Sequence, residues 1–144
     1  MNIIRNATAE DAPEIARLSA QLGYPDAIAT FAERLRRLQS RDTHAVLVHE
    51  GAGDRLDGFV GLEQRLMIES GERVEIVGLV VDEQARRTGT GRRLVAAAED
   101  WARARGMPEL FLRSNVLRAE AHPFYEQLGF LRTKTQHAYV KPLH

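Results

Sequence analysis

The chain has 144 residues, of which 44% are hydrophobic, and this length and composition predict one folded domain with a buried core. The 20 basic residues balance the 20 acidic ones, and a formal net charge of zero argues against a protein whose main partner is nucleic acid. The absence of cysteine excludes disulfides, thiolate metal ligands and a cysteine nucleophile.

The chain is expected to be cytoplasmic. Its N-terminus lacks the apolar run of a signal peptide, and no stretch approaches the roughly 20 apolar residues that a membrane span requires. The five histidines show no spacing typical of metal ligands. We therefore expect a single domain over residues 1–144, with no metal and with neither a membrane nor nucleic acid as partner.

The N-terminal part predicts a strand followed by two helices. Ile3–Arg5 is a short apolar strand. Thr8–Asp11 has the pattern of a capping box, and apolar residues at helical spacing follow it. This first helix should end at Gly23, and a second should begin at Pro25 or Asp26.

Three strands are expected next. They cover His44–Glu50, Gly58–Ile68 and Arg73–Val81, and each is separated from the next by a short turn rich in glycine or polar residues. Strands joined in this way pair as an antiparallel meander.

The remaining elements alternate between helix and strand. A strand reached across a helix usually runs parallel to the one before it, which gives a mixed sheet. The order β-α-α-β-β-β-α-β-α-β predicts an α/β domain with a mostly antiparallel central sheet flanked by helices. The predicted segments are a helix at Gly89–Arg105, a strand at Glu109–Arg113, a helix at Ala119–Leu128, and final strand pieces at Phe130–Arg132 and Tyr139–Lys141.

A glycine-containing loop between a strand and a helix is the most informative feature. Gly89 and Gly91 lie where the helix should begin. Helix N-termini carry unpaired N–H groups and a positive dipole end, and glycine lets a ligand come close to the backbone, so the loop suits a phosphate. Arg86, Arg87 and Arg92 add positive charge. The alternative is an ordinary tight turn with solvated arginines.

Two motifs resemble those of the GNAT (Gcn5-related) N-acetyltransferase family. The first is Arg86-x-x-Gly89-x-Gly91, after an apolar strand and before an amphipathic helix. The second joins Asn115 to the block Phe124–Phe130, which is similar to the family's Asn…Phe-Tyr-x-x-Leu-Gly-Phe pattern. The order of elements also matches over the whole chain. The resemblance implies the GNAT fold and acetyl-CoA as the cofactor.

The resemblance also implies where the cofactor lies. The pyrophosphate would contact N–H groups of the loop, the pantetheine arm would pair with the strand before it, and Asn115 would hydrogen-bond that arm. An N–H near Leu79 would polarise the thioester carbonyl. The cofactor-binding residues implied in this way are Leu79, Val80, Val81, Arg86, Arg87, Thr88, Gly89, Thr90, Gly91, Arg92 and Asn115.

Two residues are candidates for moving protons. Tyr125 matches the family's tyrosine that protonates the leaving thiolate, although a core aromatic is the alternative. Glu75 is the candidate base for the amine, and strand alternation places it on the face of Val77, Leu79 and Val81. Its alternative is a cross-strand ion pair with an arginine such as Arg65.

The acceptor wall is implied to include the connection between the first two helices. Tyr24 and Asp26 lie there and could meet a cationic amine, although Tyr24 could instead pack and Asp26 could support the second helix. Glu63 is a second acidic candidate. His122 is a further contact or proton shuttle.

The expected function is transfer of an acetyl group from acetyl-CoA to a primary amine, of a small molecule by preference, directly within a ternary complex. The alternatives are a protein or peptide N-acetyltransferase and a non-catalytic sensor of acyl-CoA. A homodimer through Gln136–Lys141 is also left open.

Overall fold

The structure is a computed structural model that describes residues 3–114 and 121–144. The chain forms two compact units, Met1–Leu112 and Arg113–His144. The single domain expected over residues 1–144 stays a prediction. In the described part of the chain, no helix is both long enough and apolar enough to cross a bilayer.

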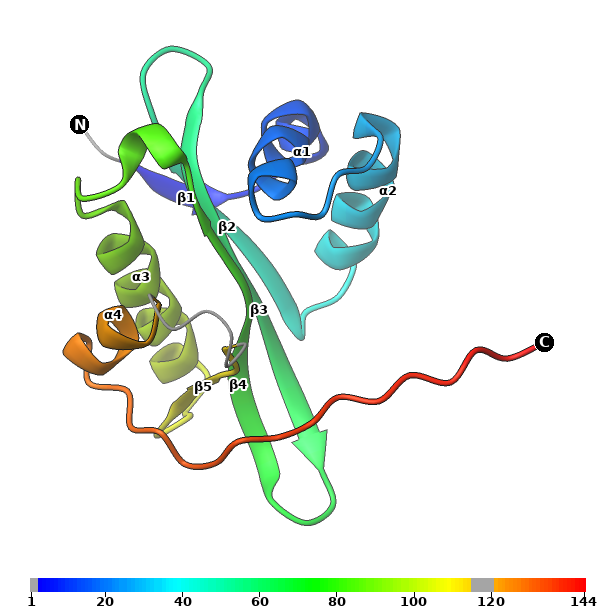
Figure 1. Ribbon diagram of the computed structural model, residues 1–144, viewed down its shortest axis with the longest axis vertical. Coiled ribbons are helices and arrows are strands. Elements are labelled where there is room, and N and C mark those ends of the chain that lie inside the picture. Colours follow the sequence, from blue (N-terminus) through cyan, green and yellow to red (C-terminus); the bar gives the residue numbers. More distant parts are fainter. Residues whose placement is uncertain (1–2, 115–120) are drawn as a thin grey trace. The chain divides into compact units, whose positions relative to one another are not determined.

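The first unit is built on a five-stranded sheet whose spatial order follows the chain, β1-β2-β3-β4-β5 (Figure 1). Neighbouring strands from β1 to β4 pair antiparallel, and β5 pairs parallel to β4. The meander and the parallel fifth strand predicted from sequence are therefore confirmed. The strands are β1 (Ile4–Asn6), β2 (His44–Glu50), β3 (Leu56–Met67), β4 (Gly71–Val81) and β5 (Leu110–Leu112).

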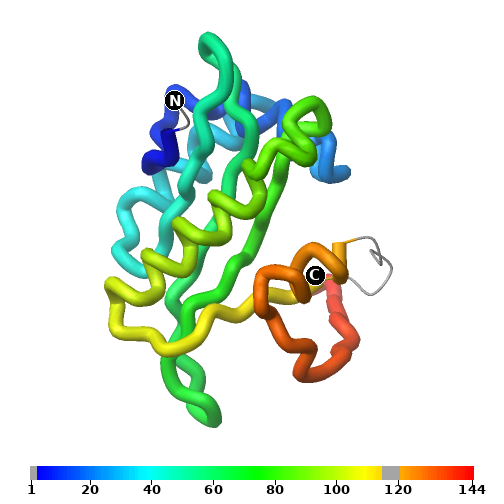
Figure 2. Tube along the Cα trace, turned by 90° about the vertical axis from the view of Figure 1, so that its left-hand side faces the viewer, coloured from blue at the N-terminus to red at the C-terminus, as the bar shows by residue number. Residues whose placement is uncertain are grey.

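Helices cover both faces of this sheet. α1 (Ala12–Gln21) and α2 (Ile28–Gln39) lie together on one face, and α3 (Thr90–Ala104) lies along the other (Figures 1 and 2). Short 3-10 turns, η1 (Ala9–Asp11) and η2 (Glu83–Ala85), precede α1 and α3. α2 begins at Ile28 rather than at Pro25 or Asp26, because Asp26 lies outside the helix and accepts the Ala27 N–H at 2.8 Å.

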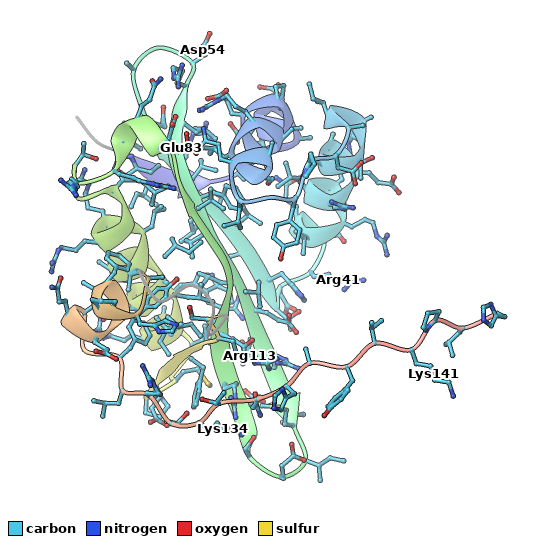
Figure 3. The ribbon with its side chains drawn as sticks, in the orientation of Figure 1. Arg41, Asp54, Glu83, Arg113, Lys134 and Lys141 are labelled. Carbon is cyan, nitrogen blue, oxygen red and sulfur yellow. The ribbon has the colours of Figure 1, made fainter. Side chains whose placement is uncertain are left out.

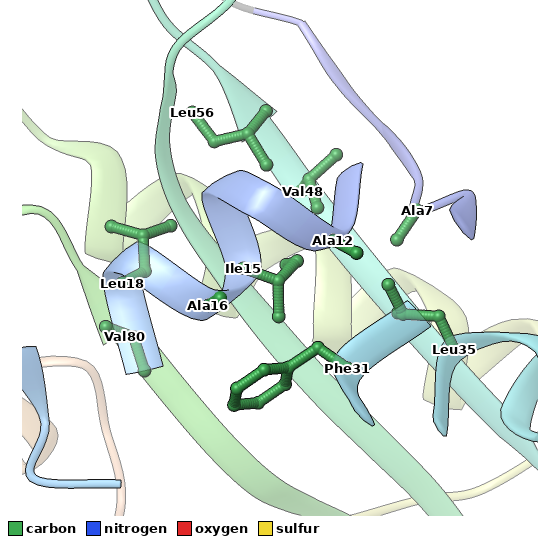
Figure 4. Packing of buried hydrophobic residues seen from close by; sticks show 10 residues of the cluster. All are labelled: Ala7, Ala12, Ile15, Ala16, Leu18, Phe31, Leu35, Val48, Leu56 and Val80. Carbon is green, nitrogen blue, oxygen red and sulfur yellow. The ribbon is translucent and has the colours of Figure 1, made fainter. Parts of the chain in front are cut away.

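The two faces have separate apolar layers. Between α1, α2 and the sheet, a cluster contains Ile15, Leu18, Phe31, Val48 and Val80, with Leu35 of α2 beside it (Figure 4). On the opposite side α3 buries Leu94, Val95, Ala98 and Ala102, the apolar positions that helical spacing predicts for a helix packed on a sheet. Burial on both faces fixes which way each side chain of the sheet points.

A β-bulge interrupts this alternation in β4. Gly61 pairs with Gly78, but the next residue of β3, Leu62, pairs with Ile76, so Val77 is extra. Directly paired residues point to the same face, and Glu75 pairs with Glu63 on the α1 and α2 side. The sequence-based placement of Glu75 on the face of Val77, Leu79 and Val81 is therefore wrong. Beyond the bulge its face continues through Gly78 and Val80.

In its described residues the second unit has the short helix α4 (His122–Gln127), followed by Gly129 at a positive φ of 93°. Residues 130–144 form neither helix nor strand, so the predicted strand pieces Phe130–Arg132 and Tyr139–Lys141 are not strands. Leu131, Tyr139 and Val140 are exposed, and without an apolar partner the β-forming residues of this segment gain nothing from pairing. Figure 3 shows its two lysines, Lys134 and Lys141.

The apolar layer under α3 gives a direct test of the fold. Leu62 is 1% exposed and Leu66, on the same strand and face, is 77% exposed. We expect Leu62→Ala to lower the free energy of unfolding by about 2–5 kcal/mol, because it leaves a cavity, and Leu66→Ala to change it by less than about 0.5 kcal/mol. Urea denaturation followed by circular dichroism measures both. Equal losses in the two variants would contradict the placement of the core.

Candidate functional site

An open strand edge defines the centre of the candidate site. The parallel pairing of β4 with β5 runs from Val74 to Ile76 on β4, and β4 then continues alone on that side to Val81. Among the described residues no other strand pairs with this edge. Backbone N–H and C=O groups along Val77–Val81 are thus available to an extended ligand, as at the edge of any sheet.

The glycine-containing loop lies at the end of this open edge. α3 begins at Thr90 with Gly89 as its N-cap, at φ 88°. The first backbone bond of the helix is donated by Arg93 N–H to the Gly89 carbonyl at 3.0 Å. The N–H groups of the first turn, before Arg93, are therefore not used by the helix itself and point out of its N-terminus. This end of a 15-residue helix suits an anion.

The backbone before the helix is strained. Arg87 has φ 67°, a left-handed conformation that costs a non-glycine residue about 1–2 kcal/mol. Thr88 donates its N–H to the Ala85 carbonyl at 3.4 Å, and its hydroxyl lies 3.0 Å from that of Thr90. Thr90 is 1% exposed, so its side chain faces the protein. Arg86, Arg87 and Arg92 are exposed, which leaves their charges free to meet a phosphate.

A network of charged groups attaches this loop to α1. Asp82, which follows β4, is 2% exposed and accepts hydrogen bonds from Arg17 at 2.9 Å and from Arg55 at 3.1 Å. Arg17 also pairs with Glu14 at 2.9 Å. Gln21 accepts the Glu83 N–H at 3.0 Å, at the point where β4 enters the loop, marked by Glu83 in Figure 3. α1 therefore holds the start of the loop.

The same network perturbs the pKa of Asp82. Burial alone would raise the pKa of this carboxyl, but the Gln84 N–H and then the Arg17, Arg55 and Gln21 side chains stabilise the carboxylate and lower it to about 2. Asp82 is thus ionised, and its charge is compensated from α1 and from the β2–β3 turn.

A row of charged side chains crosses the sheet on the α1 and α2 face. Arg65 contacts Glu63 at 3.6 Å and Glu75 at 3.4 Å, and Glu63 lies 3.8 Å from the Nε2 atom of His44. Glu75 is 5% exposed, whereas the Glu63 side chain is 33% exposed. The cross-strand pairing of Glu75 with Arg65, an alternative drawn from the sequence, is present. Glu63 is the carboxylate that meets solvent.

Of the two candidate residues in the α1–α2 connection, one is available to a ligand and the other is bonded locally. Tyr24 is 69% exposed, so it does not pack into the core. Asp26 is engaged locally, because its carboxylate accepts the Ala27 N–H at 2.8 Å and pairs with Arg34 at 3.3 Å. Tyr24 is therefore the more available contact for a ligand.

Three further candidates belong to the second unit. Tyr125 lies on α4 and stacks edge-on with Phe124 and Phe130, at centroid distances of 5.5 and 6.1 Å. His122 is the first residue of α4 and is half-buried. Asn115 lies outside the described residues, as does the start of the predicted helix Ala119–Leu128.

The first unit thus brings together the loop, the open edge of β4 and the two glutamates. Sequence reasoning missed the residues that support them: Arg17, Gln21, Arg55 and Asp82. Their contacts join residues up to 65 positions apart, and no local sequence spacing predicts such pairs. The one available signal was an acidic residue directly after a buried strand.

Comparisons with known proteins agree with this arrangement. The profile of the Acetyltransferase (GNAT) family matches residues 9–130. The uncharacterised N-acetyltransferase YhdJ of Bacillus subtilis is 30% identical over 137 residues, 94% of this chain and 91% of that protein. An aminoglycoside N(6')-acetyltransferase type 1 of Stenotrophomonas maltophilia is 31% identical over 144 residues, 97% of this chain and 93% of that protein.

A solved structure shows the same fold. The structure of AAC(6')-Iy in complex with the bisubstrate analogue CoA-S-monomethyl-acetylneamine superposes with a TM-score of 0.85 and 21% identity, covering 99% of each chain. The chain belongs to the GNAT family, has its fold, and is an acyltransferase of the N-acetyltransferase class.

The Asp82 network predicts how stability depends on pH. Because the pKa of Asp82 is lowered from 3.8 to about 2, its ionised form stabilises the fold above about pH 4, and this contribution disappears as pH falls towards 2. We expect Asp82→Asn to lower the free energy of unfolding at pH 7 by about 2 kcal/mol and to flatten its change between about pH 4 and pH 2.

Urea denaturation at a series of pH values measures this effect. Asp100→Asn is the matched control, since the Asp100 side chain is 79% exposed on α3, and it should behave as the unmodified protein. An Asp82→Asn variant as stable as the control at pH 7 would contradict the network's role.

Proposed function

We propose that this protein transfers an acetyl group from acetyl-CoA to the primary amine of a small molecule, directly and within a ternary complex. The observation that carries the proposal is the open edge of β4 leading into the N-terminus of α3. An extended strand edge followed by unused helix N–H groups is complementary to a ligand with an amide-containing arm and a pyrophosphate.

The donor would be held mainly by backbone. The arm of acetyl-CoA would pair with Leu79–Val81, and the pyrophosphate would lie on the N–H groups of Gly89 to Arg92, with Arg86 and Arg87 beside it. A backbone N–H near Leu79 would stabilise negative charge on the thioester oxygen as the amine adds. Asn115 is proposed as a further contact to the arm. Acetyl-CoA supplies the activated acetyl group.

The acceptor would enter from the α1 and α2 face of the sheet. A protonated amine is attracted by the partly exposed Glu63 carboxylate, which directly opposes Glu75 in the sheet. Because Glu75 is buried, we propose that it takes the proton of the amine through water. Arg65 touches both carboxylates, so an incoming cation would compete with it for them. Tyr24 would offer an exposed ring face.

The remaining proton movement involves the thiol. The neutral amine nitrogen forms the bond to the acetyl carbon, the carbon–sulfur bond breaks, the nitrogen gives up its extra proton to water, and the thiolate takes a proton. Tyr125 is the proposed donor, with His122 close to it in sequence as an acceptor-side contact. The phenol would be restored by solvent after product leaves.

Aminoglycosides are the first acceptors to test. The relative from Stenotrophomonas maltophilia is named as an aminoglycoside N(6')-acetyltransferase and matches 97% of this chain. Glu63 and Glu75 add negative charge where a polycationic sugar would enter. The two other outcomes are a peptide amine as acceptor and acyl-CoA binding without turnover. Measurement of thiol release distinguishes them.

Donor binding is tested by calorimetry with acetyl-CoA. We expect Gly91→Glu to weaken binding by about 100-fold or more, because a carboxylate at the N-terminus of α3 repels the pyrophosphate and fills its space. Ala96→Glu adds the same charge at an exposed position of the same helix and should bind as the unmodified protein does. No binding by the folded, unmodified protein at millimolar acetyl-CoA would overturn the proposal.

Thiol release from acetyl-CoA then identifies the acceptor. A panel of aminoglycosides, small amines and peptides is added, and release above the rate without acceptor marks a substrate. Release with peptides alone would replace the small-molecule proposal, and binding without release for any amine would indicate a sensor.

The two proton-transfer residues should affect opposite ends of the pH profile. General acid–base groups typically contribute 10²- to 10⁴-fold, so we expect Glu75→Gln and Tyr125→Phe each to lower kcat about 100-fold or more. Glu75→Gln should remove the fall in rate at low pH, and Tyr125→Phe the fall at high pH. A kcat that is unchanged at every pH in either variant would remove that residue from the mechanism.

A further inference from the structure

A fully buried histidine lies behind the loop. His49, on β2, is 0% exposed, and its Nε2 atom lies 3.1 Å from the Nε atom of Arg93 on α3. Its other ring nitrogen, Nδ1, lies 3.5 Å from the Asp57 carboxylate, and it is the one fully buried side-chain nitrogen or oxygen of the described residues that has no hydrogen bond within the usual limits. A buried polar ring with such partners calls for an explanation.

The contact with Arg93 determines the protonation of the ring. The Nε–H of arginine can donate but cannot accept, so the Nε2 atom of His49 must be the bare, accepting nitrogen. The proton of the neutral imidazole is therefore on Nδ1, where it faces Asp57. A second proton on Nε2 would remove the acceptor and place a positive ring against the guanidinium.

Arg93 in turn holds the glycine-containing loop. Its Nη2 atom donates to the Thr88 carbonyl at 3.0 Å, and its Nη1 atom lies 3.0 Å from the position that a Cβ on Gly89 would occupy. Arg93 thus spans from the buried ring of His49 to the backbone just before α3. It contacts the loop from behind and is half-buried, unlike the exposed Arg92 beside it.

The sheet is shaped to admit this histidine. Gly58 pairs directly with His49 and carries no side chain. The register shifts between His49 and Glu50, which makes Asp57 the extra residue of a β-bulge and brings its carboxylate towards the ring. A Cβ at Gly58 would lie 2.5 Å from the Val80 carbonyl, so a larger residue cannot enter there without moving β4.

We propose that His49 is a positioning residue that holds the phosphate-binding loop in its ligand-ready conformation through Arg93, and that protonation of His49 releases it. The proposal rests on the proposed function, since it concerns the site for the pyrophosphate of acetyl-CoA. Binding of the donor should therefore weaken when the His49 ring carries a second proton.

The charged groups around the ring set the direction of this response. Asp57 on β3 and Arg93 on α3 face the imidazole, and β1 contributes Ile4 as the direct partner of His49. Protonation would strengthen the contact with Asp57 and turn the contact with Arg93 into repulsion. The guanidinium would then leave the ring, and the Thr88 carbonyl and Gly89 would lose their support.

Nuclear magnetic resonance tests the positioning without any ligand. In the free protein at about pH 8, ¹⁵N shifts of the His49 ring should show the tautomer with its proton on Nδ1. Lowering the pH until the ring signals of His49 report a second proton should move the amide signals of Thr88 and Gly89 together with them. A proton on Nε2 at about pH 8, or loop amides that do not follow the titration of the ring, would overturn the proposal.

Calorimetry with acetyl-CoA tests the consequence. His49→Gln keeps an accepting oxygen near the place of Nε2 but cannot titrate, so its affinity should stay within about threefold of the unmodified protein at pH 8 and vary less with pH. His49→Leu removes the acceptor and should bind about tenfold more weakly at pH 8. His137→Gln, in the exposed C-terminal segment, is the control and should retain the full pH dependence.

The two proposals fail in different ways. An unmodified protein that does not bind acetyl-CoA overturns the proposed function, while the resonance data still decide whether His49 positions the loop. Binding with the same pH dependence in His49→Gln as in the unmodified protein overturns the role of His49 and leaves the proposed function intact. If His49→Leu does not fold, His49→Gln and the resonance data decide alone.

Discussion

The bulge at Val77 is the local feature of the sheet on which the rest of the site depends. It inserts one residue into β4 opposite the Gly61–Leu62 step of β3. β4 pairs with β5 up to Ile76, and from the bulge onwards that side of β4 has no partner strand among the described residues. A bulge bends its strand and strengthens the local twist, which gives a physical reason for the two parallel strands to part here. The open edge and the change of face therefore occur at the same residue.

Because of the change of face, the side chains of β4 before and after the bulge have different roles. Before the bulge, Glu75 faces the α1 and α2 side together with Glu63, and Val74 and Ile76 face α3. After the bulge, Val80 returns to the core under α1, where it packs with Leu18. One strand can thus present a carboxylate and an apolar anchor on one face, while its free backbone edge remains available to a ligand.

The sequence predicted most of the fold and only part of the site. Hydrophobic periodicity, turn residues and helix caps are local signals, and they placed β2 at His44–Glu50, the meander and the start of α3 within a residue or two. The bulge in β4 was not predicted, because strict alternation of side chains is the default pattern of a strand. The C-terminal strand pieces were wrong because residues such as Tyr139 and Val140 favour strands only when a partner strand exists.

The site residues divide in the same way. Gly89 could be predicted from the sequence, because glycine is favoured where a strand-to-helix junction needs a left-handed backbone. Its φ of 88° is such a conformation. No local pattern predicted the roles of Asp82, Arg17, His49 and Arg93, because their partners come from other elements. Asp82 joins α1 to the entry of the loop, and His49 joins β2 to its exit through Arg93.

These two attachments explain how a short loop with a strained residue can stay in place. Arg87 in a left-handed conformation costs about 1–2 kcal/mol, and a loop with free N–H groups gains nothing until an anion arrives. The Asp82 contacts fix the backbone before the strained residue, and Arg93 fixes it after. The strain is therefore supported by the buried Asp82 and its arginine partners on one side and by Arg93 on the other, and the first turn of α3 keeps its N–H groups free for an anion.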